Sequence, residues 1–114
     1  MTDLATVTGE EREDTVIARV AGEIDPSNAP VVGSGLRQLV SNQMMSLVVD
    51  LTEVTYLDSS GIALFFGLAS ELREHQQTLS LVVDPSGPIA RMVGLAGLDV
   101  AVAVHETLDA ALGT

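Results

Sequence analysis

Apolar residues occur along this chain in two patterns: short continuous runs, and longer segments with helical spacing. Short runs rich in β-branched residues and bounded by turn residues are typical of strands buried in a sheet. Such runs predict strands at Leu4–Thr8 on a sheet edge, Thr15–Ala21, Ser46–Leu51, Leu79–Val83 and Val100–Val104. Gly22 ends the second of these strands, and the acidic stretch Gly9–Asp14 predicts a turn between the first two.

Other segments place apolar residues three and four positions apart, which is the spacing of one helix face. They predict helices from the start signal Pro26-Ser27-Asn28 to Val40, over Ser59–His75, after Pro88, and over Thr107–Leu112. Gly33 and Gly35 weaken the first of these helices by about 1 kcal/mol each relative to alanine. Thr52–Leu57 is expected to be a loop that carries the chain from a strand to the second helix.

The resulting order, β-β-α-β-α-β-α-β-α, predicts the fold class. Strands that alternate with helices form a mostly parallel sheet with helical cover. We therefore expect an α/β fold in one domain, residues 1–114, with about five strands, an N-terminal antiparallel hairpin and about four helices. Functional loops of such sheets gather at the carboxyl ends of the strands. Gly22–Asp25 and Asp58–Gly61 are the loops predicted to meet there.

The charge of the chain narrows the range of partners. Sixteen acidic residues against five arginines give a formal charge of −11. Such a surface repels nucleic acid and anionic membranes, whereas a protein with a basic face complements it. The chain has no lysine or cysteine, which excludes a Walker-type phosphate loop, Schiff-base catalysis and thiolate chemistry. With neither a signal peptide nor an apolar stretch long enough for a membrane span, we expect a cytoplasmic protein.

Asp58-Ser59-Ser60-Gly61 stands where a loop becomes a predicted helix. Exposed N–H groups and a partial positive charge at a helix start favour a phosphoryl group, so the position suits a phosphoserine. Gly61 would let other groups approach the backbone closely. Aspartate and serine are also ordinary capping residues. The local sequence alone therefore leaves open whether this segment is a functional site or only a helix cap.

The wider pattern resembles the STAS domains, and among them the stand-alone bacterial anti-sigma factor antagonists. The resemblance spans Val16 to Leu112, and the matching segments are Gly22-Glu-Ile-Asp25, Leu47–Leu51, Tyr56–Ile62 and Met92–Leu98. The serine motif between a hydrophobic strand and a Phe- and Leu-rich helix is the most specific of these. One departure from the family is that Pro26–Pro30 and Gly33-Ser-Gly35 replace a more regular first helix.

The resemblance implies a regulatory protein without catalytic activity or a cofactor. In the family, an anti-sigma factor that is also a serine kinase phosphorylates the first serine of the motif, here Ser59. The unmodified antagonist binds the anti-sigma factor and frees the sigma factor, the phosphorylated form does not bind, and a phosphatase resets the switch. Glu23 and Asp25 match the loop that contributes to kinase recognition. The implied partner-binding residues are Glu23, Asp25, Asp58, Ser59, Ser60 and Gly61, and we expect a monomer.

Other functions are weighed for the same residues. A STAS module in a transport or sensory assembly is the nearest alternative. A receiver-like domain would need a lysine, and an esterase would need a Gly-x-Ser-x-Gly setting and a histidine partner for Ser59. Asp25, Asp50 and Asp58 could converge and attract Mg²⁺, but Asp58 is better explained as a cap, and no metal site is expected at His75 or His105.

Further expectations concern the apolar residues. Phe65 and Phe66 are both expected in the core, the alternative being that one is exposed as a binding anchor. Met44 and Met45 are interpreted as packing residues.

Overall fold

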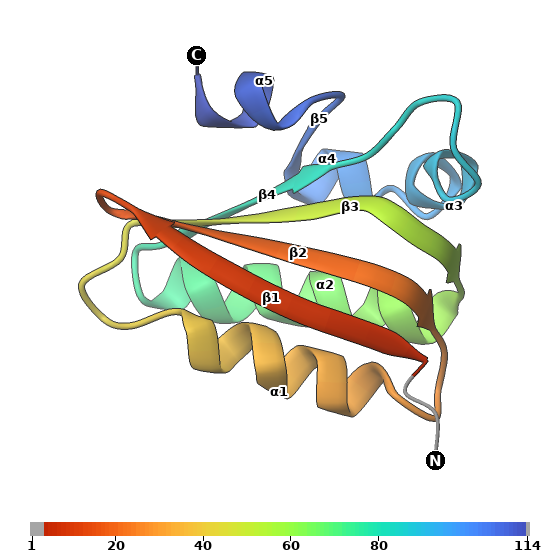
Figure 1. Cartoon of the computed structure of the whole chain (residues 1–114), viewed down its shortest axis with the longest axis horizontal. Helices are drawn as coiled ribbons and strands as arrows, with labels where there is room; N and C mark the ends of the chain where they lie inside the picture. Colours follow the sequence, from red (N-terminus) through yellow and green to blue (C-terminus); the bar gives the residue numbers. More distant parts are fainter. Residues whose placement is uncertain (1–3, 114) are drawn as a thin grey trace.

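The computed structural model describes residues 4–113 and contains one five-stranded sheet in the order β1-β2-β3-β4-β5 (Figure 1). The strands are β1 Ala5–Arg12, β2 Thr15–Ile24, β3 Ser46–Leu57, β4 Thr78–Val82 and β5 Ala103–His105. The helices are α1 Ala29–Leu39, α2 Ser59–Glu74, α3 Ala90–Leu95, α4 Leu98–Ala101 and α5 Leu108–Leu112. β1 is antiparallel to β2, and the other neighbouring strands are parallel, so the expected mixed sheet with an N-terminal hairpin is confirmed.

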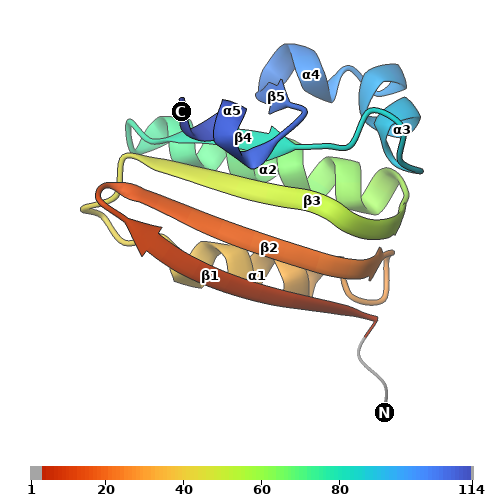
Figure 2. The ribbon, with the colours of Figure 1, turned by 45° about the horizontal axis from the view of Figure 1, so that its top comes forward.

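The helices divide between the two faces of the sheet. α1 packs on β1 and β2, α2 packs on β3 and β4, and the two helices contact each other along one face. α5 contacts β3, β4 and β5, and Figure 2 shows it on the opposite face from α1 and α2. α4 packs against α2 and α3 beside the β5 edge.

The core lies between α1, α2 and the sheet. Alternate residues of β2, including Val16, Ala18 and Val20, point into it, as the two-residue period of a strand requires. Phe65 of α2 is fully buried there, but Phe66 is exposed, so the prediction that both are core is wrong, and a role of Phe66 as a binding anchor stays a prediction. Met44 is buried and Met45 is exposed, which confirms the packing interpretation for Met44 alone.

The first two strands are longer than predicted. β1 continues to Arg12 because Glu10 and Glu11 pair with Ile17 and Val16 across the hairpin, so the predicted acidic turn shrinks to two residues. β2 does not end at Gly22. That residue has φ 108°, where a Cβ would lie 2.1 Å from the Leu4 carbonyl oxygen, and the pairing with β3 shifts register just after it. Glycine thus bends the strand without ending it.

β3 is also longer, and this moves several predicted residues. Thr52–Leu57 is strand, not loop, because the extended β2 supplies partners as far as the pair Ile24–Leu57. Asp50 therefore lies inside β3, where its carboxylate accepts hydrogen bonds from the N–H and hydroxyl of Thr52 at 2.9 and 2.7 Å. It lies seven positions before Leu57, the last residue of the strand.

The region after β4 contains one more helix than expected. Val100 and Ala101 belong to α4, not to a strand, and the chain therefore has five helices within residues 4–113. Gly97, at φ 74°, reverses the chain before α4. Leu98 and Val102 are then buried four positions apart, which is helical spacing that the β-branched composition concealed.

α1 forms where it was predicted, with Asn28 before its first residue, but its apolar face differs. Val31 is 71% exposed, whereas Val32 and Leu36 are buried.

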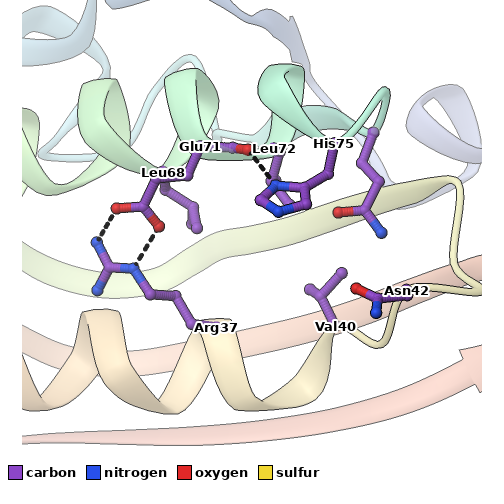
Figure 3. Close-up of a pocket in the computed structure, with 8 residues that line it drawn as sticks. Arg37, Val40, Asn42, Leu68, Glu71, Leu72 and His75 are labelled. Carbon is purple, nitrogen blue, oxygen red and sulfur yellow. Dashed lines mark hydrogen bonds and ion pairs between the residues drawn. The ribbon is translucent and has the colours of Figure 1, made fainter.

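Arg37 joins α1 to α2 through two hydrogen bonds to the Glu71 carboxylate, at 2.7 and 3.1 Å (Figure 3). His75 ends α2, and its Nδ1 lies 2.9 Å from the Glu71 carbonyl oxygen. Within residues 4–113, none of the helices has the length and apolar character needed to cross a membrane.

Candidate functional site

The site begins at the junction between β3 and α2. Asp58 is the N-cap of α2, and its carboxylate accepts a hydrogen bond from the Ser60 N–H at 2.9 Å. The same oxygen also accepts the Ser60 hydroxyl. This arrangement uses the local preference of aspartate and serine for helix starts. The capping interpretation is therefore correct for Asp58, whereas Ser60 is the residue whose N–H and hydroxyl bind that cap.

Ser59 is left out of the cap. It is the first residue of α2 and is exposed, whereas Ser60 is half-buried. Within the described part of the chain its hydroxyl has no hydrogen-bond partner, whereas the N–H and the hydroxyl of Ser60 both bind Asp58 Oδ1. The two adjacent serines thus have different states, one engaged in the fold and the other free to react.

A second aspartate turn lies beside the first. Asp25 follows β2 directly and accepts the Ser27 N–H at 2.8 Å, together with the Ser27 hydroxyl. Asn28 fixes the loop, since its Oδ1 accepts the Asp25 N–H at 2.9 Å and its Nδ2 donates to the Glu23 carbonyl at 2.8 Å. Because Ile24 and Leu57 are register partners, the turns that follow them are neighbours at the same edge of the sheet.

The predicted residues of this edge differ in accessibility. Glu23 is exposed and Asp25 and Asp58 are half-buried, so three acidic side chains reach solvent at the sheet edge where α2 and Ser59 begin. Gly61 is buried instead. A Cβ on it would lie 2.1 Å from Leu57 Cδ1 and 3.1 Å from Ile24 Cγ2. The close approach at Gly61 is therefore to core side chains beneath the helix start, and no external group reaches it.

The acidic edge has consequences for a phosphoryl group on Ser59. Hydrogen bonds from the Ser60 hydroxyl, and then from the N–H groups of Ser60 and Gly61, hold the pKa of Asp58 below its ordinary value of 3.8. Asp58 is consequently ionised at neutral pH. Backbone N–H groups of the helix start were expected to favour a phosphate, but the Ser60 N–H is already used by this carboxylate, so a phosphoryl group here would meet a negative neighbour.

The edge does not form a metal site. No group of three or more histidine, aspartate or glutamate side chains within residues 4–113 is placed to hold a metal ion. Asp50 lies inside β3 and so does not converge with Asp25 and Asp58. Each of the three carboxylates instead accepts hydrogen bonds from a serine or threonine two residues later.

Tyr56 is a residue of this edge that the sequence interpretation missed. It is exposed and is the register partner of Glu23, two residues before the Asp58 cap. Exposed aromatic residues are frequent anchors of protein interfaces. If Thr52–Leu57 had been predicted as a continuation of the strand, Tyr56 would have been expected beside Glu23. The length of β3 was therefore the feature needed to find this residue.

Two shallow hollows lie between α1 and α2. The one beside the site has a volume of about 390 Å³ and is lined by Pro26, Ala29, Pro30, Arg37, Ser60, Ala63 and Leu64. The other, of about 160 Å³, lies at the far ends of the two helices and is drawn in Figure 3. Arg37 lines both, and its ion pair with Glu71 separates them. The first hollow adds an apolar depression to the surface next to Ser60.

Comparison with known proteins assigns this architecture to a family. The family model of the STAS domain matches residues 6–111. The chain belongs to the STAS domain family. Among solved structures, this STAS domain is similar to a crystal structure of an anti-sigma factor antagonist from Mycobacterium paratuberculosis, with a TM-score of 0.84 and 28% identity over 96% of this chain and 92% of that one.

Curated relatives of the STAS domain carry related names. The anti-sigma-B factor antagonist of Listeria monocytogenes is 40% identical over 72 residues, which cover 63% of each chain. The anti-sigma-F factor antagonist RsfB of Mycobacterium tuberculosis is 29% identical over 111 residues, covering 96% of this chain and 88% of the relative. The match with the Listeria relative thus leaves more than a third of that protein unaligned.

Proposed function

We propose that this chain is an anti-sigma factor antagonist whose binding is switched by phosphorylation of Ser59. The unmodified protein binds an anti-sigma factor that is also a serine kinase, and so releases the sigma factor. Phosphorylated Ser59 prevents that binding until a phosphatase removes the group. The observation that carries the proposal is the free, exposed Ser59 hydroxyl beside the capped Ser60, and the names of the relatives support it.

In this function the chain is the phosphoryl acceptor and not the catalyst. The Ser59 oxygen bonds to the γ-phosphorus of ATP, the bond to the ADP oxygen breaks, and the hydroxyl proton passes to a base of the kinase. Glu23, Asp25, Asp58 and Tyr56 form the contact surface around this oxygen. Because the reaction needs ATP, the exchange takes place in the cytoplasm, between a single STAS domain and its partner.

Electrostatics at the acidic edge explains the switch. The phosphoryl group adds about 1.5 to 2 negative charges at the centre of the contact surface. It lies next to the ionised Asp58, whose own hydrogen bonds leave no spare Ser60 N–H to neutralise the new charge. A loss of about 3 to 4 kcal/mol in binding, which is several hundred-fold in affinity, is enough to release the partner.

The test compares the two serines of the motif. The wild type, Ser59→Ala, Ser60→Ala and Ser70→Ala are incubated with ATP, Mg²⁺ and each candidate anti-sigma kinase from the same genome. Ser70 is an exposed serine of the same helix and serves as the matched control. We expect only Ser59→Ala to lose phosphoryl incorporation, with the group mapped to Ser59 by mass spectrometry. Incorporation that persists in Ser59→Ala, or that requires Ser60, would overturn the assignment.

A further inference from the structure

Apolar side chains project from α3 and α4 into solvent. Met92 is 38% exposed, Leu95 75% and Val100 89%, and these residues together are called the α3–α4 surface. Other residues of this region pack against the rest of the domain: Ile89, just before α3, Val93 of α3 and Leu98 of α4 are buried. The α3–α4 surface therefore contributes nothing to the core, and large exposed apolar side chains in a group are a feature of interaction surfaces.

This part of the chain also differs in charge from the rest. Residues 85–104 contain one arginine and one aspartate, Arg91 and Asp99, and so have no net charge. The whole formal charge of −11 is carried by the remaining residues. An acidic protein that keeps one segment neutral and apolar has a surface that a partner can approach without electrostatic repulsion and without needing basic residues.

The α3–α4 surface lies at the same end of the molecule as Ser59. α3 follows the carboxyl end of β4, which is parallel to β3, and α2 begins at the carboxyl end of β3. Figures 1 and 2, seen from two directions, both have α3 beside the end of β3 from which α2 starts. One partner can therefore span the acidic edge and the α3–α4 surface together.

We propose that the α3–α4 surface is a second contact for the anti-sigma kinase and receives an apolar segment of that partner. The proposal rests on the function proposed above. The partner chemistry follows from charge: basic side chains meet Glu23, Asp25 and Asp58, and an adjoining apolar segment meets Leu95 and Val100. This contact lies on α3 and α4 and does not include Ser59, so it adds affinity to the contact at the acidic edge.

A second copy of this chain fits the surface less well. Three side chains are far fewer than the about 20 residues per side that a stable interface uses, so the contact must extend over neighbouring surface. The neighbouring surface at this end is the acidic edge, and two copies would bring like charges together there. A partner with a basic region and an adjoining apolar segment complements both the acidic edge and the α3–α4 surface.

The experiment measures the affinity of the unmodified protein for the anti-sigma kinase that phosphorylates it, by isothermal titration calorimetry. The test variants are Leu95→Ser, Val100→Ser and the two combined. Val31→Ser is the matched control, because Val31 is 71% exposed on α1 and lies outside the surface. We expect the double variant to bind at least about tenfold more weakly, which is about 1.4 kcal/mol, and Val31→Ser to bind as the wild type does. Urea midpoints of all variants should agree, since no core residue changes.

The outcomes separate the two proposals. Wild-type affinity in the double variant overturns the α3–α4 contact even where phosphorylation of Ser59 still abolishes binding. Weakened binding in the double variant, together with indifference to phosphorylation, supports the contact and overturns the switch. A wild-type dimer that the double variant converts to a monomer in sedimentation velocity makes a second copy the occupant and overturns the proposal. Failure of every candidate kinase to bind overturns both.

Discussion

Gly61 lies in the first turn of α2 against Leu57 and Ile24, which leave no space for a larger residue. The Cβ of Gly61→Ala would stand 2.1 Å from Leu57 Cδ1, so Leu57 must move by more than 1 Å. Leu57 and Ile24 are both buried, and overpacking of this kind costs up to about 3 kcal/mol. Alanine returns about 1 kcal/mol through helix propensity. We expect a net loss of about 2 kcal/mol, which lowers Tm by roughly 8 °C.

Gly67 provides the control in the same helix. A Cβ on Gly67 has no neighbouring atom within 4 Å, so only the propensity gain remains. Gly67→Ala should therefore stabilise the protein by about 0.5 to 1 kcal/mol. Both variants replace a glycine of α2 with alanine, yet Gly61→Ala is predicted to lower the free energy of unfolding and Gly67→Ala to raise it.

Urea denaturation followed by circular dichroism measures both free energies of unfolding. Shortening the obstructing side chain gives a further check, because Leu57→Ala should cost less in the Gly61→Ala background than in the wild type. Equal stabilities of Gly61→Ala and Gly67→Ala would refute the argument that contact with Leu57 dictates glycine at the start of α2.

Other expectations follow from the same structure. Gly22→Ala should lower the urea midpoint sharply and speed hydrogen exchange at the β1–β2 edge, because φ is 108° and its Cβ would meet the Leu4 carbonyl oxygen; a midpoint equal to that of the wild type would contradict this. The Arg37 guanidinium holds the pKa of Glu71 below its ordinary value of 4.5, so the pair stabilises the fold above about pH 5 and is lost as the pH falls through the lower folded-state pKa. Arg37→Met should thus cost up to about 1 kcal/mol at pH 7 and progressively less as the pH falls below the ordinary glutamate pKa in urea titrations, and a cost that does not change with pH would argue against the ion pair. Asp58→Asn keeps a cap acceptor but removes a charge, so it should weaken kinase binding several-fold in calorimetry while lowering Tm only slightly; unaltered affinity would remove Asp58 from the contact surface.

Local signals in the sequence were sufficient for the helix starts and the central strands. Asp58 caps the start of α2 because capping depends on a few adjacent residues, and α1 begins directly after Asn28, whose side chain holds the preceding loop. Pairing between distant segments was not visible locally. The second half of β3 reads as polar loop, and it is strand only because β2 continues beside it past Gly22. Val100 resembles a strand residue by its β-branching, yet its segment is helical, with Leu98 and Val102 buried four positions apart and Asp99 and Val100 exposed between them.

The candidate site was predicted in its position but not in its chemistry. The sequence could indicate that the loops after β2 and β3 meet, because parallel strands end at one edge of a sheet. It could not indicate that Ser60 occupies the Asp58 carboxylate and leaves Ser59 free, since two adjacent serines look alike in a sequence. The buried setting of Gly61 likewise depends on Leu57 packing beneath it.

The central claim is that one phosphoryl group on Ser59 separates the chain from its partner. The most direct measurement is the dissociation constant of the anti-sigma kinase for the unmodified protein and for quantitatively phosphorylated protein, by calorimetry at one ionic strength. We expect the phosphorylated form to bind several hundred-fold more weakly, and Ser59→Ala to bind like the unmodified protein before and after exposure to ATP. Equal affinities of the two forms would contradict the account.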